Sequence, residues 1–350
     1  MRKALKLCSW QPSCRSEQPR PAAPARPRGG RVSHDVVIAV DVGGTMIKCA
    51  LADLEPSGAV TARHTERRPT HAERGPDAVV DRILDVAESL AERARADGLN
   101  PRAVGLAAPG IVDETRGVAA YSANIGWRDV PLRDLAADRL GLPAVLGHDV
   151  RTGGLAEARL GAGQGASQLL FVPIGTGIAG AHVVAGEVST GAHGAACELG
   201  HIVVRPDGRR CGCGRRGCLE AEASAAAVAS RYAERTGRQA SAADVAREAV
   251  AGEPAAVAVW RQTVDALADG LLTAITLYDP ELIVIGGGLA EAGEHLLHPL
   301  HAAIDARRTF EAPPVLAPAA LGDQAGCLGA ALLAAAATTN AAAASSGDNT

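Results

Sequence analysis

The feature that most constrains the fold is a pair of strand-like runs joined by a glycine turn, because this pattern occurs twice in the chain. Residues 36–52 hold a β-branched run, a glycine turn and a second strand-like run. Residues 169–185 repeat that order around another glycine turn. Two similar hairpins of this kind predict two related domains.

Strands and amphipathic helices alternate along the rest of the chain, which predicts an α/β protein. Apolar residues recur at helical spacing over 76–97, as expected for a helix with one face in the core. Turn-forming residues separate the segments. The expected helices are 76–97, 132–140, 150–160, 223–236, 242–251, 255–278 and 326–337, and the further strands are 60–67, 103–107, 144–146 and 281–285.

The two ends of the chain differ in composition from its body. Residues 1–34 carry eight Lys or Arg, one Glu and five Pro, and we expect a disordered basic tail there. The formal net charge of the whole chain is −4, so the rest carries −11, which argues against a nucleic-acid-binding face on the body. Residues 338–350 are of low complexity and are also expected to be disordered.

A chain of 350 residues has room for about two domains of ordinary size. Its Ala-rich stretch at 329–337 is shorter than the ~18 to 20 apolar residues that span a bilayer. Residues 1–8 are not followed by the apolar segment of a secretory signal. We therefore expect a cytoplasmic protein with reduced cysteines and no membrane partner.

The turn after the first strand has residue types that suit a nucleotide phosphate. Gly43 and Gly44 permit close approach of the backbone, and Thr45 offers a hydroxyl donor. Asp41 offers a carboxylate for a hydrated Mg²⁺. A tight hairpin that binds nothing is the alternative.

Two further glycine turns stand at the ends of strand-like runs. The later one also precedes an expected helix, whose first backbone N–H groups would face a nucleotide. The chain has no Walker A lysine motif and no GxGxxG, which disfavours a P-loop enzyme or a dinucleotide-binding dehydrogenase. The two turns are Gly175, Thr176 and Gly177, and Gly286, Gly287 and Gly288.

Three cysteines lie within eight residues and alternate with glycines. Cys211, Cys213 and Cys218 offer three thiolates, and His201 lies ten residues before the first of them. One His and three Cys satisfy tetrahedral Zn²⁺ and leave no position for water, so the pattern predicts a structural zinc site. Unlinked buried cysteines and disulfides are the alternatives.

A carboxylate follows the strand expected at 144–146. Asp149 stands where a side chain at the carboxyl edge of a sheet faces a cleft. A carboxylate there can act as general base toward an alcohol. The alternative is an ordinary N-cap of the helix that starts at Val150.

Other polar residues lie beside these motifs. Glu198 and Glu220 bracket the expected zinc ligands, and carboxylates accept vicinal sugar hydroxyls well. Asn124 lies just before Trp127 and is a third candidate of this kind. The alternatives are that the two glutamates lie on the solvated surface and that Asn124 only forms an Asx-turn.

Six segments together resemble one family. They are Asp41–Thr45, Asn124–Leu132, Gly175–Gly177, Gly191–Gly194, Glu198–His201 and Cys211–Glu220. The family is the repressor, open reading frame, kinase (ROK) family, in particular its glucokinase-like members, and the resemblance spans about residues 36–337. The segment with the three cysteines is its most specific part.

The resemblance implies a two-lobed α/β fold of the actin-like, sugar kinase and Hsp70 (ribonuclease H-like) type. The N-terminal lobe would cover 35–149, with the last helix at 326–337 packing back on it. The C-terminal lobe would cover 150–325 and include a zinc loop at 201–218. Such proteins often form homodimers or homotetramers.

The resemblance also implies roles for the candidate residues. Asp149 would deprotonate the 6-hydroxyl of a hexose as that hydroxyl attacks the γ-phosphate of ATP. The sugar would be held by Asn124, Glu198, His201, which also binds zinc, and Glu220. Phosphates and Mg²⁺ would be held by Asp41, Gly43, Gly44, Thr45, Thr176 and Gly177, and the adenosine side by Gly286, Gly287 and Gly288.

Three positions depart from the family pattern. Gly147, His148 and Asp149 stand where many members have Glu-Asn-Asp, so a histidine replaces the asparagine expected to touch the sugar. His148 would donate to a hydroxyl, and its charge would make affinity sensitive to pH. Met46 replaces a frequent Lys and Cys197 a common Gly, and neither change should abolish activity.

The expected function is ATP-dependent phosphorylation of glucose to glucose 6-phosphate. Kinases for mannose, fructose, N-acetylglucosamine or N-acetylmannosamine are alternatives, as is a catalytically silent sugar-binding protein. A sugar-sensing repressor would need a helix-turn-helix domain ahead of Asp41, where 34 residues are too few and too Pro-rich.

Overall fold

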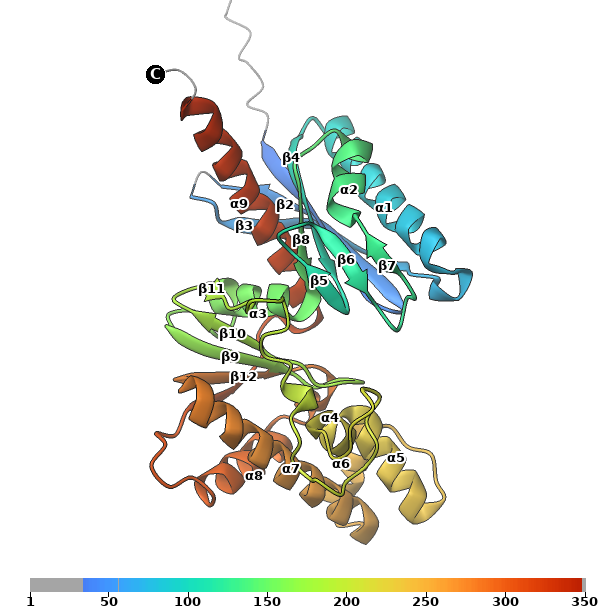
Figure 1. Cartoon of the computed structure of the whole chain (residues 1–350), viewed down its shortest axis with the longest axis vertical. Coiled ribbons are helices and arrows are strands. Elements are labelled where there is room, and N and C mark those ends of the chain that lie inside the picture. Colours follow the sequence, from blue (N-terminus) through green and yellow to red (C-terminus); the bar gives the residue numbers. More distant parts are fainter. Residues whose placement is uncertain (1–33, 56, 348–350) are drawn as a thin grey trace, which may run out of the picture. The chain divides into compact units, whose positions relative to one another are not determined.

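The computed structural model describes residues 34–55 and 57–347 (Figure 1). Apart from His34, the basic tail expected at 1–34 therefore lies outside the described residues. No helix in the described part of the chain combines the length and the apolar character that crossing a bilayer requires.

A first five-stranded sheet has the order β3-β2-β1-β4-β8. Strands β1, β2 and β3 form an antiparallel meander, β4 pairs in parallel with β1, and β8 pairs in parallel with β4. The strands are β1 (Asp35–Val42), β2 (Met46–Leu54), β3 (Val60–Pro69), β4 (Asn100–Ala108) and β8 (Ala144–His148). Because β1, β4 and β8 are parallel, their carboxyl ends lie at the same edge of the sheet.

Helices cover both faces of this sheet. A short turn of 3₁₀ helix (Ala72–Arg74) leads into α1 (Pro76–Ala96), which lies with α2 (Leu132–Leu140) over one face. The last helix, α9 (Ala325–Gly347), lies over the other (Figure 1). It approaches so closely that a Cβ at Gly105 would be 1.9 Å from the carbonyl oxygen of Ala330. Small residues on both partners make this packing possible.

Helix α9 is longer than the sequence predicted. We expected it to end at residue 337 and the chain to be disordered over 338–350, but the helix continues to Gly347. Alanine has the highest helix propensity, so the Ala-rich composition that reads as low complexity also favours a helix. The expectation of disorder is thus wrong for residues 338–347.

A second five-stranded sheet repeats the topology of the first, with the order β11-β10-β9-β12-β13. Again the first three strands are antiparallel and the last two join in parallel. The strands are β9 (Gln168–Pro173), β10 (Ala181–Val184), β11 (Glu187–Val188), β12 (Leu282–Gly286) and β13 (Val315–Pro318). This repeat confirms the two related halves predicted from the glycine hairpins.

Helix α3 (Asp149–Leu160) links the two sheets. Its Leu155 and Ala156 pack against α9, and its Val150 and Ala158 pack beside Phe171 of β9. The other helices of the second half share one large core: α4 (Leu219–Ala223), α5 (Ala225–Thr236), α6 (Ala242–Val250), α7 (Pro254–Tyr278) and α8 (Glu294–Asp305). Short 3₁₀ helices lie at Leu199–His201, Gly288–Ala292 and Gly322–Gln324.

A small three-stranded sheet was not predicted, and the helix expected after Gly288 was predicted without bounds; α8 begins only at Glu294. The sheet consists of β5 (Ile111–Asp113), β6 (Val118–Tyr121) and β7 (Arg128–Val130), which are too short to show an alternating pattern. Helix α8 contains Pro299, which interrupts a helical pattern in the sequence.

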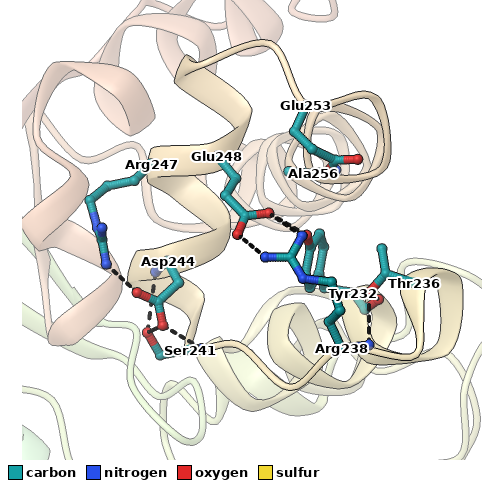
Figure 2. Close-up of polar contacts among 9 residues, drawn as sticks. All are labelled: Tyr232, Thr236, Arg238, Ser241, Asp244, Arg247, Glu248, Glu253 and Ala256. Atoms are coloured by element: carbon teal, nitrogen blue, oxygen red, sulfur yellow. Dashed lines mark hydrogen bonds and ion pairs between the residues drawn. The ribbon is translucent and has the colours of Figure 1, made fainter.

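Polar contacts fix α6 against α5 (Figure 2). Arg238, which follows α5, donates to Glu248 Oε1 at 2.7 Å, and the Tyr232 hydroxyl donates to the same carboxylate. At the start of α6, Ser241 and Asp244 form a capping box: Asp244 N donates to Ser241 Oγ at 3.2 Å, and Ser241 N donates to Asp244 Oδ2 at 2.9 Å. These contacts hold one wall of a pocket described below.

Candidate functional site

A cavity of about 510 Å³ lies where strand ends of both sheets come close to the start of α9. In open α/β sheets the carboxyl ends of the strands form the usual binding crevice. Six of the predicted site residues line this cavity: Asp41, Gly43, Asp149, Gly286, Gly287 and Gly288. The remaining predicted phosphate-binding residues, Gly44, Thr45, Thr176 and Gly177, do not line it, and neither do the residues predicted to hold the sugar.

The first glycine turn is braced from inside the protein. Gly43 N donates to the carbonyl of Met46 at 2.9 Å, and the buried Thr70 donates its hydroxyl hydrogen to the carbonyl of Gly43 at 2.7 Å. Gly44 and Thr45 are exposed at the tip. Asn124 lies beside them, since a Cβ at Gly44 would be 3.6 Å from the Cβ of Asn124. The turn thus offers free backbone N–H groups next to a polar side chain.

The second and third glycine turns are neighbours. Ile174, just before the second turn, donates its N–H to the carbonyl of Gly286 at 2.9 Å and accepts from Leu289 N at 3.0 Å. Gly287 has φ 75°, and a Cβ there would be 2.5 Å from the carbonyl oxygen of Ile174. Only glycine suits that position. The helix expected after this turn is a 3₁₀ helix, and α8 follows it.

Asp41 is 8% exposed and lies 3.6 Å from Nζ of Lys48. Burial raises the pKa of Asp41, while Lys48 lowers it. On its other side the carboxylate lies against the first turn of α9, because a Cβ at Gly326 would be 2.6 Å from Asp41 Oδ2. Lys48 was not predicted, although the register of the first hairpin pairs it directly with Asp41.

Asp149 is the first residue of α3, and the N-cap position belongs to His148. The N-cap interpretation of Asp149 is therefore wrong. Its Oδ1 accepts from Val150 N at 2.8 Å, and its side chain is 31% exposed. Burial within the protein and then the negative charge of Asp41 raise the pKa of Asp149 to about 7. A carboxyl group with such a pKa is suited to exchange a proton near neutral pH.

His148 is only 7% exposed, with Nε2 3.4 Å from Asp149 Oδ1. Burial and the positive charge of Arg151 lower the pKa of His148 to about 3. The prediction that the charge of His148 makes sugar affinity sensitive to pH is therefore wrong, because the ring stays neutral at physiological pH. Sequence analysis also missed Glu114, whose carboxylate accepts from His148 N and from Arg151.

The glutamates predicted for the sugar site take different places. Glu198 is exposed, and its charge contributes to the raised pKa of Asp149. Glu220 Oε2 accepts from Ile178 N at 3.0 Å, and a Cβ at Gly177 would be 2.5 Å from the same oxygen. Glu220 Oε1 is 4.0 Å from Cys211 Sγ. Glu220 therefore connects the second glycine turn to the cysteine cluster.

The four predicted zinc ligands converge. One ligand atom from each of His201, Cys211, Cys213 and Cys218 lies within 4.8 Å of the others. The distance from Cys211 Sγ to His201 Nδ1 is 3.7 Å, and that from Cys213 Sγ to Cys218 Sγ is also 3.7 Å. Zn–S bonds of about 2.3 Å in a tetrahedron place two sulfurs about 3.8 Å apart. The donor set and its spacing fit Zn²⁺.

A second, mainly apolar pocket of about 310 Å³ shares Gly288 and Glu291 with the cavity. Helix α6 supplies one wall with Ala246 and Val250, and Trp260 of α7 supplies another. A flat ring system with apolar faces suits such a lining.

The repeated α/β topology, with Asp41 and Asp149 beside glycine turns at the strand ends, is the arrangement expected of a sugar kinase. The chain belongs to the ROK family, whose family model matches residues 37–337.

Relatives with similar sequences and structures cover nearly the whole described part of the chain. A glucokinase of Thermotoga maritima is 35% identical over 312 residues, which are 84% of this chain and 96% of the relative. The structure of a ROK hexokinase from Thermus thermophilus is similar with a TM-score of 0.74 at 33% identity, covering 87% and 99% of the two chains. A ROK glucokinase of Streptomyces griseus, solved with glucose and AMPPNP, has a TM-score of 0.71 at 30% identity, covering 85% and 99%.

Proposed function

We propose that the protein transfers the γ-phosphoryl group of ATP to the 6-hydroxyl of glucose. The observation that carries this proposal is Asp149, which lines the same cavity as Gly43 and Gly287 and has a pKa of about 7. The glucokinase relatives support glucose as the acceptor.

Asp149 accepts the proton of the 6-hydroxyl as the oxygen forms its bond to the γ-phosphorus. The bond between that phosphorus and the bridging oxygen breaks, and ADP leaves with the bridging oxygen. Asn124, His148, Glu198, His201 and Glu220 hold the sugar in this proposal.

The glycine turns hold the nucleotide. Phosphates meet the backbone N–H groups of Gly44, Gly177, Gly286, Gly287 and Gly288 and the hydroxyls of Thr45 and Thr176. Gly43, whose N–H is bonded to Met46, lets the backbone approach the phosphates closely. Mg²⁺, held through water by Asp41, supplies positive charge for the phosphates. The apolar pocket beside Gly288 suits the adenine ring.

Zinc has a structural role in this proposal. It ties His201 to the loop of Cys211, Cys213 and Cys218 and leaves no open position for chemistry. Because Glu220 contacts both that loop and Ile178, the metal would hold the second glycine turn in place.

We also propose that the protein works in the cytoplasm as a homodimer or homotetramer, as the family resemblance implies. Light scattering of the purified chain at several concentrations tests the assembly, and a monomer at every concentration would contradict it.

The decisive experiment measures ADP release with ATP and Mg²⁺ against glucose, mannose, fructose, glucosamine, N-acetylglucosamine and N-acetylmannosamine. We expect glucose to give the highest kcat/KM. A clear preference for another sugar would identify that sugar, rather than glucose, as the acceptor. No turnover with any sugar contradicts the kinase proposal, and glucose binding without turnover would favour the silent sugar-binding protein.

The matched variant Asp149→Asn tests the base. Loss of the proton acceptor should lower kcat by at least about 100-fold, because general base catalysis typically contributes that much. Its thermal unfolding should remain close to that of the wild type. A kcat within about tenfold of the wild-type value, a difference of ~1.4 kcal/mol in barrier, would assign the role to another group.

A further inference from the structure

The cavity and the apolar pocket meet at two residues, Gly288 and Glu291, which line both of them. The cavity contains Asp149 and the glycine turns, and the pocket has Trp260 in its wall. A nucleotide with its phosphates in the cavity and its base in the pocket must therefore pass Gly288 and Glu291. Because the ribose joins the phosphates to the base, the ribose of such a nucleotide lies at this junction.

The 3₁₀ helix that carries Glu291 is fixed to the body of the protein. It spans Gly288–Ala292, and its Leu289 is buried in the core of the second half. Leu289 N donates to the carbonyl of Ile174, just before the second glycine turn, at 3.0 Å. Glu291 itself is exposed, and no hydrogen bond or ion pair within residues 34–55 and 57–347 engages its carboxylate. The junction thus presents a positioned carboxylate that a ligand can reach.

Two other side chains of the pocket lining can carry charge, Arg247 and His295. The guanidinium group of Arg247 forms an ion pair with Asp244 at the start of α6 (Figure 2). Neither Arg247 nor His295 lines the cavity. The carboxylate of Glu291 is therefore the polar side-chain group that the cavity and the pocket share.

The negative charge of Glu291 decides which part of a nucleotide it can contact. A carboxylate repels phosphate groups, and it accepts hydrogen bonds but donates none. The ribose has two neighbouring hydroxyls, and both can donate to the two oxygens of one carboxylate. The amino group of adenine is also a donor, but it lies on the side of the base away from the ribose and hence away from the cavity.

We propose that Glu291 binds the 2′- and 3′-hydroxyls of the ribose, which makes it a residue that determines specificity for the phosphoryl donor. This inference rests on the proposed function, because it requires a nucleotide in the cavity. A donor without ribose, such as inorganic polyphosphate, gains no hydrogen bond from Glu291 and meets its negative charge.

A glutamate that only contacts solvent predicts a different result. Its replacement would leave the Kd of every nucleotide unchanged. If its charge acted on the phosphates from a distance, its removal would strengthen the binding of ADP and of inorganic tripolyphosphate alike. Direct contact with the ribose instead makes the loss of affinity depend on the hydroxyls of the ligand, because the two partners of one hydrogen bond are coupled.

The test is titration calorimetry in the presence of Mg²⁺ with ADP, 2′-deoxy-ADP, 3′-deoxy-ADP and inorganic tripolyphosphate. In the wild type, removal of either hydroxyl should raise Kd about tenfold, the lower end of the effect of a hydrogen bond to a charged group, because the carboxylate is exposed. In Glu291→Ala each of these ratios should shrink to less than about threefold. ADP should bind this variant about tenfold more weakly. Tripolyphosphate, which has no ribose, should bind it no more weakly than it binds the wild type.

Glu294→Ala is the matched control. Glu294 is also exposed, is the first residue of α8, and lines neither the cavity nor the pocket. This variant should keep the ratios of the wild type. Glu291→Gln keeps the size of the side chain and one acceptor oxygen but loses the charge, so its ratios should lie between those of the wild type and of Glu291→Ala.

Three results would overturn the proposal: equal Kd values for the three nucleotides in the wild type, unchanged ratios in Glu291→Ala, or equal losses for ADP and tripolyphosphate in that variant. In each of these cases the protein still binds ADP, and the proposed phosphoryl transfer from ATP stands. If the wild type binds none of the nucleotides, the proposed function is contradicted, and the role of Glu291 with it. Because the readout is binding, the choice of the acceptor sugar does not affect the result.

Discussion

At the scale of single residues, Asp41 and Asp149 determine the electrostatics of the cavity. The negative charge of Asp41 is one reason why the pKa of Asp149 is raised, and Lys48 lies 3.6 Å from Asp41 on its other side. A cation bound through Asp41 would add positive charge and favour the ionised form of Asp149. In the proposed mechanism, binding of Mg²⁺ with the nucleotide would thus favour the ionised, proton-accepting form of Asp149.

This coupling predicts a pH dependence. A carboxyl group whose pKa is raised to about 7 is protonated below that pH and cannot accept the proton of a sugar hydroxyl. We expect kcat/KM for glucose to fall about tenfold per pH unit below about 7 and to level off above it. The pH–rate profile between 5 and 9 measures this limb. A flat profile down to pH 5 would show that Asp149 is ionised throughout.

Cys197 has a left-handed backbone conformation, with φ 65°, just before Glu198. A side chain in this conformation costs about 1–2 kcal/mol, which glycine avoids. We expect Cys197→Gly to have a free energy of unfolding about 1 kcal/mol higher than Cys197→Ala, which keeps a Cβ but also removes the thiol. Urea unfolding of the two variants measures the difference, and equal stabilities would mean that the surrounding structure removes the strain.

At the scale of elements, periodicity predicted most of the strands and helices that form the two sheets and their cover. The glycine turns were recognisable because their residue types are needed for their shape, as at Gly287. Glu114 was not recognisable from the sequence, because it follows a strand of only three residues. Its carboxylate takes part in the site only through its contact with Arg151, which is far away in the sequence. Contacts of that kind arise from tertiary packing, which a local pattern does not encode.

The loop from His201 to Cys218 should depend on its metal. We expect about one zinc per chain, and we expect Cys211→Ser to lose the metal and to unfold at a lower temperature, because metal binding contributes to folding. Cys49→Ala, which removes a buried thiol outside the cluster, should keep the zinc. Elemental analysis and thermal unfolding measure both effects. A zinc-free wild type with full stability would contradict this role.

At the scale of the whole molecule, the described residues belong to one compact unit in which α3 and α9 pack on each other. We therefore expect a single thermal unfolding transition rather than one for each sheet. Glucose at 100 times its Kd should stabilise the folded protein by about 2.7 kcal/mol, which raises the transition by several degrees. Differential scanning calorimetry tests this. Two separate transitions, of which glucose shifts only one, would show that the halves unfold independently.

The close contact between Asp41 and Gly326 has a consequence for protein synthesis. Asp41 belongs to β1, the first strand of the described chain to leave the ribosome, whereas Gly326 belongs to α9, which together with α3 covers one face of that strand's sheet. At translation rates of 5–20 residues per second, roughly 15–60 s pass between the two. During that time the apolar face of the sheet lacks its permanent cover, so a nascent chain exposes a surface for chaperones to bind. A chain that stops before α9 also lacks Ala325 and Gly326, which line the cavity beside Asp41 and Asp149.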